Sequence, residues 1–312
     1  MTKKILFACF ALLAVAAYLV SAKPSKKSKN ADDSATKEAL RTATEDFVRV
    51  EAGTFMMGTV GGGNFGNLPF DENEAHSVTL TRSYYMCDHE VTNAEYKAVM
   101  GKVHRLNKGG DNVPVVYVSW NNMIDYCNKL SELQGLTPCY TKEKGKVTCD
   151  FTANGYRLPT DAEWERAARA GNDTTELLTY NGITEDSSLD KETKDSLLGE
   201  YAWHPFNSGR KLHPVKEKKP NAWGLYDMIG NVWEVCWDFS SKLLNGEPAT
   251  DPTGPASAPS DWTCHVTRGG GFYDPGPVNT KYMTDSNRHW GLDEVRSGSD
   301  RYGFRVVRTA DD

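Results

Sequence analysis

The chain has 312 residues, of which 39% are hydrophobic and 25% charged, so its composition is that of a folded protein and excludes a largely disordered chain. The 36 Lys and Arg residues are outnumbered by 42 Asp and Glu residues, which gives a net charge of −6. Because a nucleic-acid-binding protein needs a basic excess to neutralise phosphates, this balance argues against nucleic acid as a partner.

The N-terminus has the pattern of an export signal. Two Lys residues precede the apolar run 5–20, and the small residues Ser21 and Ala22 follow it. The run is too short to span a membrane, so we expect a cleaved signal peptide over residues 1–22. The alternative is a lipoprotein signal, because the residues that end at Cys9 resemble a lipobox. Both readings predict export to the cell surface or periplasm, and the second adds a lipid anchor at the outer membrane.

The next segment, residues 23–46, consists mainly of Lys, Ser, Asp, Thr and Ala. With almost no large apolar side chain it is predicted to be a flexible tether. Alternating apolar residues then predict two short strands, at 47–50 and 54–58, joined by a turn at Gly53. We place a single folded domain over residues 47–312.

Three helices are predicted from the signals at their ends. The first helix is expected to begin at Thr92 and end at Gly101, the second to begin at Ser119 and end at Gly135, and the third to begin at Thr160 and end at Gly171. In the first and third helices a Glu three residues after the Thr completes a capping box. The acidic, polar segment 176–200 has few apolar residues and is predicted to be a surface insertion.

Six cysteines remain after the signal: Cys87, Cys127, Cys139, Cys149, Cys236 and Cys264. An even number in an exported chain permits disulfides, but the sequence cannot choose among the possible pairings. Residues 142–145 read as a hairpin turn, so Cys139 and Cys149 could face each other across paired strands. The alternative is two unconnected thiols. No spacing of Cys and His indicates a zinc site.

Six blocks of the sequence stand in a distinctive order. They are residues 90–96, 114–120, 155–165 and 221–234, Arg268-Gly269-Gly270-Gly271, and Gly303-Phe304-Arg305. Through these blocks the chain resembles the formylglycine-generating enzyme (sulfatase-modifying factor) family over about residues 47–308. The resemblance implies an α+β fold, namely that family's form of the C-type lectin fold, rich in irregular loops. The large Trp residues of the blocks are expected in the core: Trp120, Trp164, Trp223 and Trp233.

The resemblance also bears on chemistry. It implies two active-site cysteines after the Arg-Gly-Gly motif that bind copper and oxidise a substrate cysteine. Here those two positions are Asp274 and Asn279. Copper(I) requires soft thiolate ligands, so we expect no copper and no oxidase activity, and the protein is predicted not to be an enzyme. The alternative is a residual oxidoreductase of that family acting on protein cysteines.

One metal site is implied by the resemblance. The family holds a calcium ion with residues that match Asp227, Gly230, Val232 and Glu234. Asp227 and Glu234 would supply carboxylate oxygens, and Gly230 and Val232 backbone carbonyls, which are the hard ligands that calcium prefers. The alternative is an ion-free turn in which the two carboxylates cap backbone amides.

Residues 272–302 lie between two predicted strands, at about 266–268 and 302–308, and show neither a helical nor an alternating period. Aromatic and small polar residues are mixed there as in binding loops. The predicted ligand-binding residues are Phe272, Tyr273, Asp274, Asn279, Tyr282, Asp285, Asn287, His289, Trp290, Asp293, Asp300 and Arg301. This segment also resembles the variable proteins of diversity-generating retroelements, which randomise the stretch between Arg-Gly-Gly and a C-terminal Gly-Phe-Arg.

The sequence therefore predicts an exported, non-enzymatic binding protein. Its partner would be a protein or another macromolecule at a surface, not a nucleic acid. Contact with a membrane would occur only through a lipid anchor, and the chain is expected to be a monomer.

Overall fold

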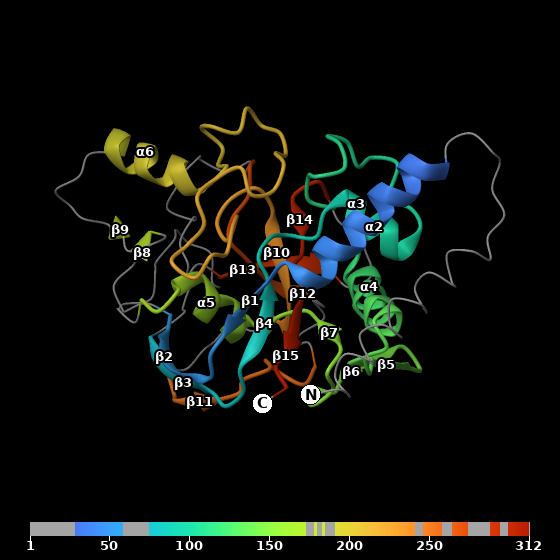
Figure 1. The fold of residues 1–312 in the computed structure, drawn as a ribbon. Coiled ribbons are helices and arrows are strands. Elements are labelled where there is room, and N and C mark those ends of the chain that lie inside the picture. The colour runs from blue at the N-terminus through green and yellow to red at the C-terminus, as the bar shows by residue number, and fades with distance from the viewer. Residues whose placement is uncertain are drawn as a thin grey trace, which may run out of the picture.

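A computed structural model of the chain describes residues 29–58, 75–172, 178–179, 183–184, 191–240, 246–257, 264–273, 288–293 and 299–311. Short helices and strands are joined by long irregular connections, which confirms the predicted α+β class (Figure 1). The expected signal peptide, residues 1–22, lies outside the described residues. Within them, no helix combines the length and the hydropathy of a membrane-spanning segment.

The helices are α2 (Lys29–Glu45), α3 (Asn93–Met100), α4 (Trp120–Leu133), α5 (Asp161–Arg169) and α6 (Lys191–Tyr201). The strands are β1 (Phe47–Val50), β2 (Gly53–Met57), β3 (His76–Leu80), β4 (Tyr84–Cys87), β5 (Tyr140–Glu143), β6 (Lys146–Cys149), β7 (Tyr156–Arg157), β8 (Leu178–Thr179), β9 (Ile183–Thr184), β10 (Trp233–Phe239), β11 (Ala249–Thr250), β12 (Cys264–Arg268), β13 (Arg288–Asp293), β14 (Tyr302–Gly303) and β15 (Val307–Thr309).

The three predicted helices α3, α4 and α5 are confirmed together with their caps. Both capping boxes are formed, at Thr92 for α3 and at Thr160 for α5. The Ser119 side chain accepts from the third amide of α4 in the same way. Gly101 ends α3 in the left-handed region, with φ of 84°. These ends formed as predicted because each depends on residues three or four apart in the chain.

The prediction of a flexible tether at residues 23–46 is wrong for most of its length. Residues 29–45 form helix α2, which lies beside α3 in Figure 1. Ala39 and Ala43, four residues apart, are buried on one face, and Leu40 is partly buried against the same core. Small Ala side chains allow α2 to approach its neighbour closely, so the helix packs without the large apolar residues that normally reveal one.

One sheet has the strand order β1-β4-β15-β7, and it joins the two ends of the domain. Its central strand β4 pairs antiparallel with β1 near the N-terminus and with β15 near the C-terminus. The hydroxyl of Tyr84 on β4 donates to the backbone carbonyl of Glu163 on α5, at 2.6 Å. The sheet is thereby linked to α5, the helix that begins within the third block of sequence.

The second sheet, in the order β13-β12-β10-β14, corrects two predictions about the C-terminal region. Residues 272–302 were expected to be irregular throughout, but β13 forms there and pairs antiparallel with β12. The strand expected at 302–308 is two strands in two sheets: β14 pairs with β10, and β15 pairs with β4 and β7. The chain between them crosses from one sheet to the other, which places Arg305 in the interior.

The remaining strands form a sheet in the order β11-β3-β2 and the hairpins β5–β6 and β8–β9. The β5–β6 hairpin was predicted, and Tyr140 pairs with Cys149 in its register. Cys139 and Cys149 are both free thiols in the structure, as are the other four cysteines after the signal. Cys139 lies one residue before the paired position, so the two sulfurs do not face each other across the strands.

Two clusters of buried residues make up the core. Trp120 and the apolar face of α4 lie in one, and Trp164 lies in the other between α5 and the sheets. Trp120, Trp164 and Trp233 are buried as predicted, whereas Trp223 is only half-buried. The predicted surface insertion at 176–200 is described only in part. Its helix α6 contributes Leu198 to the second cluster and is therefore anchored rather than wholly superficial.

Candidate functional site

The predicted ligand-binding residues are described only in part. Phe272, Tyr273, Asp300 and Arg301 have described side chains, and Phe272 is buried. His289, Trp290 and Asp293 belong to β13, whose backbone pairs with β12 but whose side chains are not described. The others lie outside the described residues: Asp274, Asn279, Tyr282, Asp285 and Asn287.

The predicted binding segment, residues 272–302, follows β12. The last residue of that strand, Arg268, lies at the centre of a buried ion-pair network. Its guanidinium lies 2.6 Å from Asp161 Oδ1 and 2.9 Å from Glu165 Oε2, and all three side chains are buried. Gly269 follows with φ of 89°, where an added Cβ would lie 2.7 Å from the carbonyl oxygen of Met228. The Arg-Gly-Gly motif therefore fixes the direction in which the segment leaves β12.

Phe272 fastens the start of the segment. Its amide donates to the carbonyl of Asn231 at 2.8 Å, and its own carbonyl accepts from Ser208 Oγ at 2.9 Å. At the other end, the carbonyl of Arg301 accepts from the amide of Trp233 at 2.8 Å. Phe272 and Arg301, the residues at the two ends of the predicted binding segment, are therefore both held next to the start of β10.

Tyr273, the first half-buried residue of the loop, lies between two cations. The guanidinium of Arg210 lies 5.3 Å from the centre of its ring, and that of Arg301 lies 5.8 Å away. Each contact is in the range of a cation–π interaction, worth roughly 0.5–1 kcal/mol at an exposed position. Sequence reasoning selected Tyr273 and Arg301 but missed Arg210, which is distant in the chain. This group places an aromatic side chain and two positive charges at the edge of the loop.

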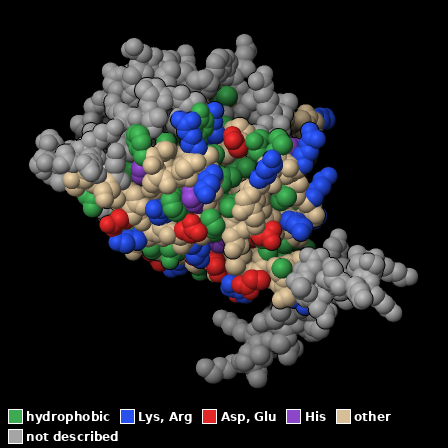
Figure 2. All heavy atoms as spheres, turned by 90° about the horizontal axis from the view of Figure 1, so that it is seen from above, with side chains coloured by type: hydrophobic (Ala, Val, Ile, Leu, Met, Phe, Trp, Pro, Cys, Tyr) green, Lys and Arg blue, Asp and Glu red, His purple; other side chains and the backbone are tan. Residues whose placement is uncertain are grey.

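Two further loops lie beside these residues. The amide of Tyr117 donates to the carbonyl of Ser299, at 3.2 Å, and that of Val215 donates to the carbonyl of Asn112, at 3.0 Å. Residues 101–117, 203–215, 271–273 and 299–301 are thus neighbours, and we call them the upper face. They lie at the top of Figure 1, and Figure 2 views the molecule from that side.

The residues implied for calcium lie in a turn that joins the core to β10. Asp227 has φ of 52° and Gly230 has φ of 89°, so the turn has a sharply bent backbone. Asp227 Oδ2 accepts from the amide of Lys216 at 2.7 Å, but its Oδ1 is buried and has no hydrogen-bond partner among the described residues. Burial raises the pKa of Asp227 to about 6. An unpartnered buried oxygen of this kind fits a cation ligand.

Glu234, the other implied carboxylate, is engaged elsewhere. Its two oxygens accept from Arg305, at 2.7 and 2.6 Å, and one also accepts from Trp164 Nε1 at 2.7 Å. Both partners are buried, so this carboxylate already has its charge balanced.

A second unpartnered carboxylate, not selected from the sequence, belongs to Glu90. Its Oε1 is buried without a hydrogen-bond partner in the described part of the chain. Burial and the nearby charges of Asp227 and Glu234 raise the pKa of Glu90 well above its usual value. Asp227 and Glu90 are therefore the two carboxylates whose oxygens a cation would satisfy. Glu90 begins the first of the six sequence blocks, but the block does not identify it as a ligand, because Glu90 approaches Asp227 only in the folded chain.

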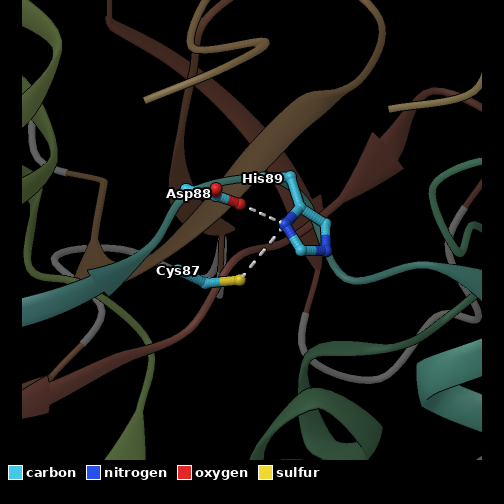
Figure 3. A group of neighbouring side chains, drawn as sticks. All are labelled: Cys87, Asp88 and His89. Atoms are coloured by element: carbon cyan, nitrogen blue, oxygen red, sulfur yellow. Dashed lines mark hydrogen bonds and ion pairs between the residues drawn. The ribbon is translucent and has the colours of Figure 1, made fainter. Parts of the chain in front are cut away.

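A third group, Cys87, Asp88 and His89, has its ligand atoms close enough together to hold a metal ion (Figure 3). His89 Nδ1 lies 2.5 Å from Asp88 Oδ1, and Nε2 lies 3.0 Å from Glu95 Oε1. Burial lowers the pKa of His89, but the opposing charges of Cys87, Glu95 and Asp88 outweigh it and hold that pKa well above its usual value. Both ring nitrogens of His89 already contact carboxylates, Nδ1 that of Asp88 and Nε2 that of Glu95, so we interpret this group as a buried ion pair.

Residues 32–310 match the family described as "Sulfatase-modifying factor enzyme 1-like domain". A relative from Paenibacillus barcinonensis named "Chaperone protein LppX" is 31% identical over 86% of this chain and 91% of its own length. A formylglycine-generating enzyme from Thermomonospora curvata is 34% identical over 52% of this chain, and the match spans only 45% of that enzyme.

The solved structure of Treponema denticola variable protein 1 is similar to this chain with a TM-score of 0.67 and 31% identity. The match covers 85% of this chain and 95% of that protein. These similarities confirm the fold inferred from the sequence blocks, the formylglycine-generating-enzyme form of the C-type lectin fold. They also confirm the resemblance of the chain to a variable protein.

Proposed function

The chain belongs to the sulfatase-modifying factor enzyme 1-like domain family, and from this premise we propose that it is an exported, non-enzymatic binding protein. Its ligand would be a protein or another macromolecule, bound by the loop that starts at Phe272 and ends at Arg301. Residues 1–22 would direct export, as a cleaved signal or as a lipoprotein signal, and the mature chain would act as a monomer at the cell surface or in the periplasm.

The observation that carries this proposal is the identity of residues 274 and 279. The family's oxidase chemistry requires a thiol at each of these positions, and this chain has Asp274 and Asn279. A carboxylate and an amide cannot replace the thiolates that bind copper(I) and exchange with a substrate cysteine. Cys264, on β12, lies before the motif rather than after it and supplies only one sulfur.

Without the oxidase chemistry of the family, the loop still has the residue types of a binding site. Tyr273, Tyr282 and Trp290 would act as aromatic anchors, and acidic residues of the loop together with Arg301 would add polar selectivity. The fixed ends at Phe272 and Arg301 let the residues between them change while the scaffold remains intact. The similarity to Treponema denticola variable protein 1 supports a loop that is diversified by a retroelement.

The test has two arms. The full chain, incubated with copper and a sulfatase peptide that contains the target cysteine, is expected to form no aldehyde, and a formylglycine-generating enzyme is the positive control. Aldehyde formation above a no-protein blank would refute the non-enzymatic function. Sequencing the 3′ end of the gene in related isolates is expected to show changes confined to codons 272–302. Uniform sequences, with no template repeat or reverse transcriptase gene nearby, would refute the diversification.

We also propose one structural calcium ion in the turn before β10. Asp227 would be its first ligand, with the backbone carbonyls of Gly230 and Val232. Glu90 would add the second carboxylate, because Glu234 is held by Arg305. Such an ion would satisfy both buried oxygens that lack a partner and offset the charge that burial disfavours.

The pH dependence of calcium stabilisation tests this site. The raised pKa of Asp227 means that the ion-free protein loses stability as the pH rises from 3.8, the unfolded value, through about 6. Calcium offsets that loss, so 10 mM calcium is expected to raise the free energy of unfolding by roughly 1–3 kcal/mol at pH 7.5 and far less at pH 5. Urea unfolding with calcium or EDTA measures this difference.

Asp227→Asn is the matched variant, because Asn tolerates the left-handed backbone at this position. It is expected to abolish the calcium effect while leaving the protein in EDTA at least as stable as the parent at pH 7.5. An equal calcium effect in both proteins, or at both pH values, would argue against the site.

A further inference from the structure

Two exposed apolar side chains stand out on the upper face. Leu106 is 44% exposed and Phe206 is 49% exposed, and these are the exposed large hydrophobic residues in the described part of the chain. Scattered single residues of this kind are common on protein surfaces. Here, however, both lie in the two loops that border the proposed binding loop, and the described remainder of the surface has none.

Each of the two side chains is followed by an Asn that locks its loop. Asn107 Nδ2 donates to the carbonyl of Val116 at 2.7 Å, and Asn107 Oδ1 accepts from the Val116 amide at 3.0 Å. Asn207 likewise donates to the carbonyl of Ala202 at 2.9 Å and accepts from the amide of His204 at 2.7 Å. These bonds fix the backbone of both loops, so little backbone freedom remains to be lost on binding.

Positive charge is concentrated in the two loops that carry these side chains, although the net charge of the chain is −6. Residues 101–112 and 203–211 contain five cations, and Asp111 is their only acidic residue. The cations are Lys102, Arg105, Lys108, Arg210 and Lys211, and all five are exposed. None of them forms an ion pair with another described residue, whereas the neighbouring Lys216 is paired with Asp46 and Asp88. Figure 2 shows blue and green side chains on this side of the molecule, with red ones between some of them.

We infer that these two loops are a constant docking surface for an acidic protein partner. Leu106 and Phe206 insert into apolar hollows of the partner, and the five cations face its Asp and Glu side chains. This inference rests on the proposed binding function and assigns its partner a chemical class. The loop between Phe272 and Arg301 then selects among acidic partners. Residues 101–112 and 203–211 provide affinity that sequence changes in that loop do not alter.

An acidic protein fits these observations better than a nucleic acid or a lipid surface. A polyanion carries a denser negative charge than the surface of a folded protein, so the net charge of −6 on this chain opposes it more strongly. A folded protein presents acidic and apolar groups side by side, as the upper face requires.

Fluorescence anisotropy with defined probes tests the inference on the full chain. The probe is a fluorescein-labelled 12-residue peptide in which Glu alternates with Leu and Phe, and its counterpart has Lys in place of each Glu. The Glu peptide is expected to bind in 50 mM NaCl at least about tenfold more tightly than the Lys peptide. Raising NaCl to 300 mM should weaken the binding of the Glu peptide about tenfold, because surface charges are screened.

Three double variants separate the contribution of this face from that of charge elsewhere on the protein. R105Q/K211Q is expected to weaken binding of the Glu peptide roughly tenfold in 50 mM NaCl. K129Q/K146Q removes the same charge from exposed positions on α4 and β6 and should change the affinity less than twofold. L106S/F206S should weaken binding about tenfold at both salt concentrations, because the apolar contribution is not screened.

Several results would overturn the inference. Equal binding of the Glu and Lys peptides, or equal effects of the two charge pairs, would refute a dedicated acidic docking surface. Tighter binding of a 12-nucleotide single strand, or of vesicles containing phosphatidylserine, would assign the face to polyanions instead. None of these results depends on the aldehyde assay, which alone decides the non-enzymatic function. The docking inference can therefore fail while the proposed function stands.

Discussion

Replacing Arg305 by Met is expected to lower the free energy of unfolding by about 3–5 kcal/mol, because a buried carboxylate loses its counter-charge. The Arg305 guanidinium is fully buried and donates to both oxygens of Glu234. It also donates to the carbonyls of Cys87, at 3.0 Å, and Tyr226, at 2.8 Å. Urea unfolding followed by circular dichroism measures the loss.

Two further variants identify the cause of that loss. R308M removes a neighbouring Arg whose ion pair with Asp311 is exposed, so it should cost less than about 1 kcal/mol. R305M/E234Q removes both charges and keeps an acceptor for Trp164, so it should recover part of the stability that R305M loses. The explanation fails if R305M and R308M are equally stable, or if the double variant is less stable than R305M.

Gly230→Ala is the second substitution with a large expected effect. Gly230 has φ of 89°, and a Cβ at this position would lie 2.3 Å from the carbonyl oxygen and 2.9 Å from the amide nitrogen of Trp203. Both atoms belong to backbone, so neither can rotate away. Left-handed strain and the steric overlap together should cost roughly 4 kcal/mol, measured by urea unfolding.

Gly101→Ala is the matched control, because both glycines have a left-handed φ but only Gly230 lies against neighbouring backbone. Gly101 has φ of 84°, and nothing lies within 4 Å of a Cβ built there. Its substitution should cost only the backbone strain, about 1–2 kcal/mol. The difference between the two variants therefore measures the close approach of the Trp203 backbone. Equal losses would show that the turn before β10 can move to accept a side chain.

The helices show which parts of the fold could be predicted. The caps at Thr92, Ser119 and Thr160 depend on groups a few residues apart, and all three formed as expected. Helix α2 was missed because its buried face consists mostly of Ala, which carries little hydrophobic signal. Strand β13 was missed because its pairing with β12, rather than an alternating pattern of its own, makes it a strand.

The candidate site, like the fold, could be predicted only in part from the sequence. Asp274 and Asn279 could be read from the sequence, because the order of the blocks fixes where the family's thiols should be. The excess of cations in residues 101–112 and 203–211 was also visible in the sequence. The sequence does not indicate that these cations share one surface, because nothing in it shows that the two loops become neighbours.

The family, the ends of the main helices and the lack of thiols at residues 274 and 279 could all be predicted from the amino-acid sequence. These features depend on short-range contacts or on the order of motifs. Three long-range arrangements emerge only in the folded chain: Arg305 pairs with Glu234, Glu90 lies near Asp227, and Arg210 and Arg301 flank Tyr273. Partners that lie far apart in the chain meet only when the loops between them close, and no local pattern records which of them will meet.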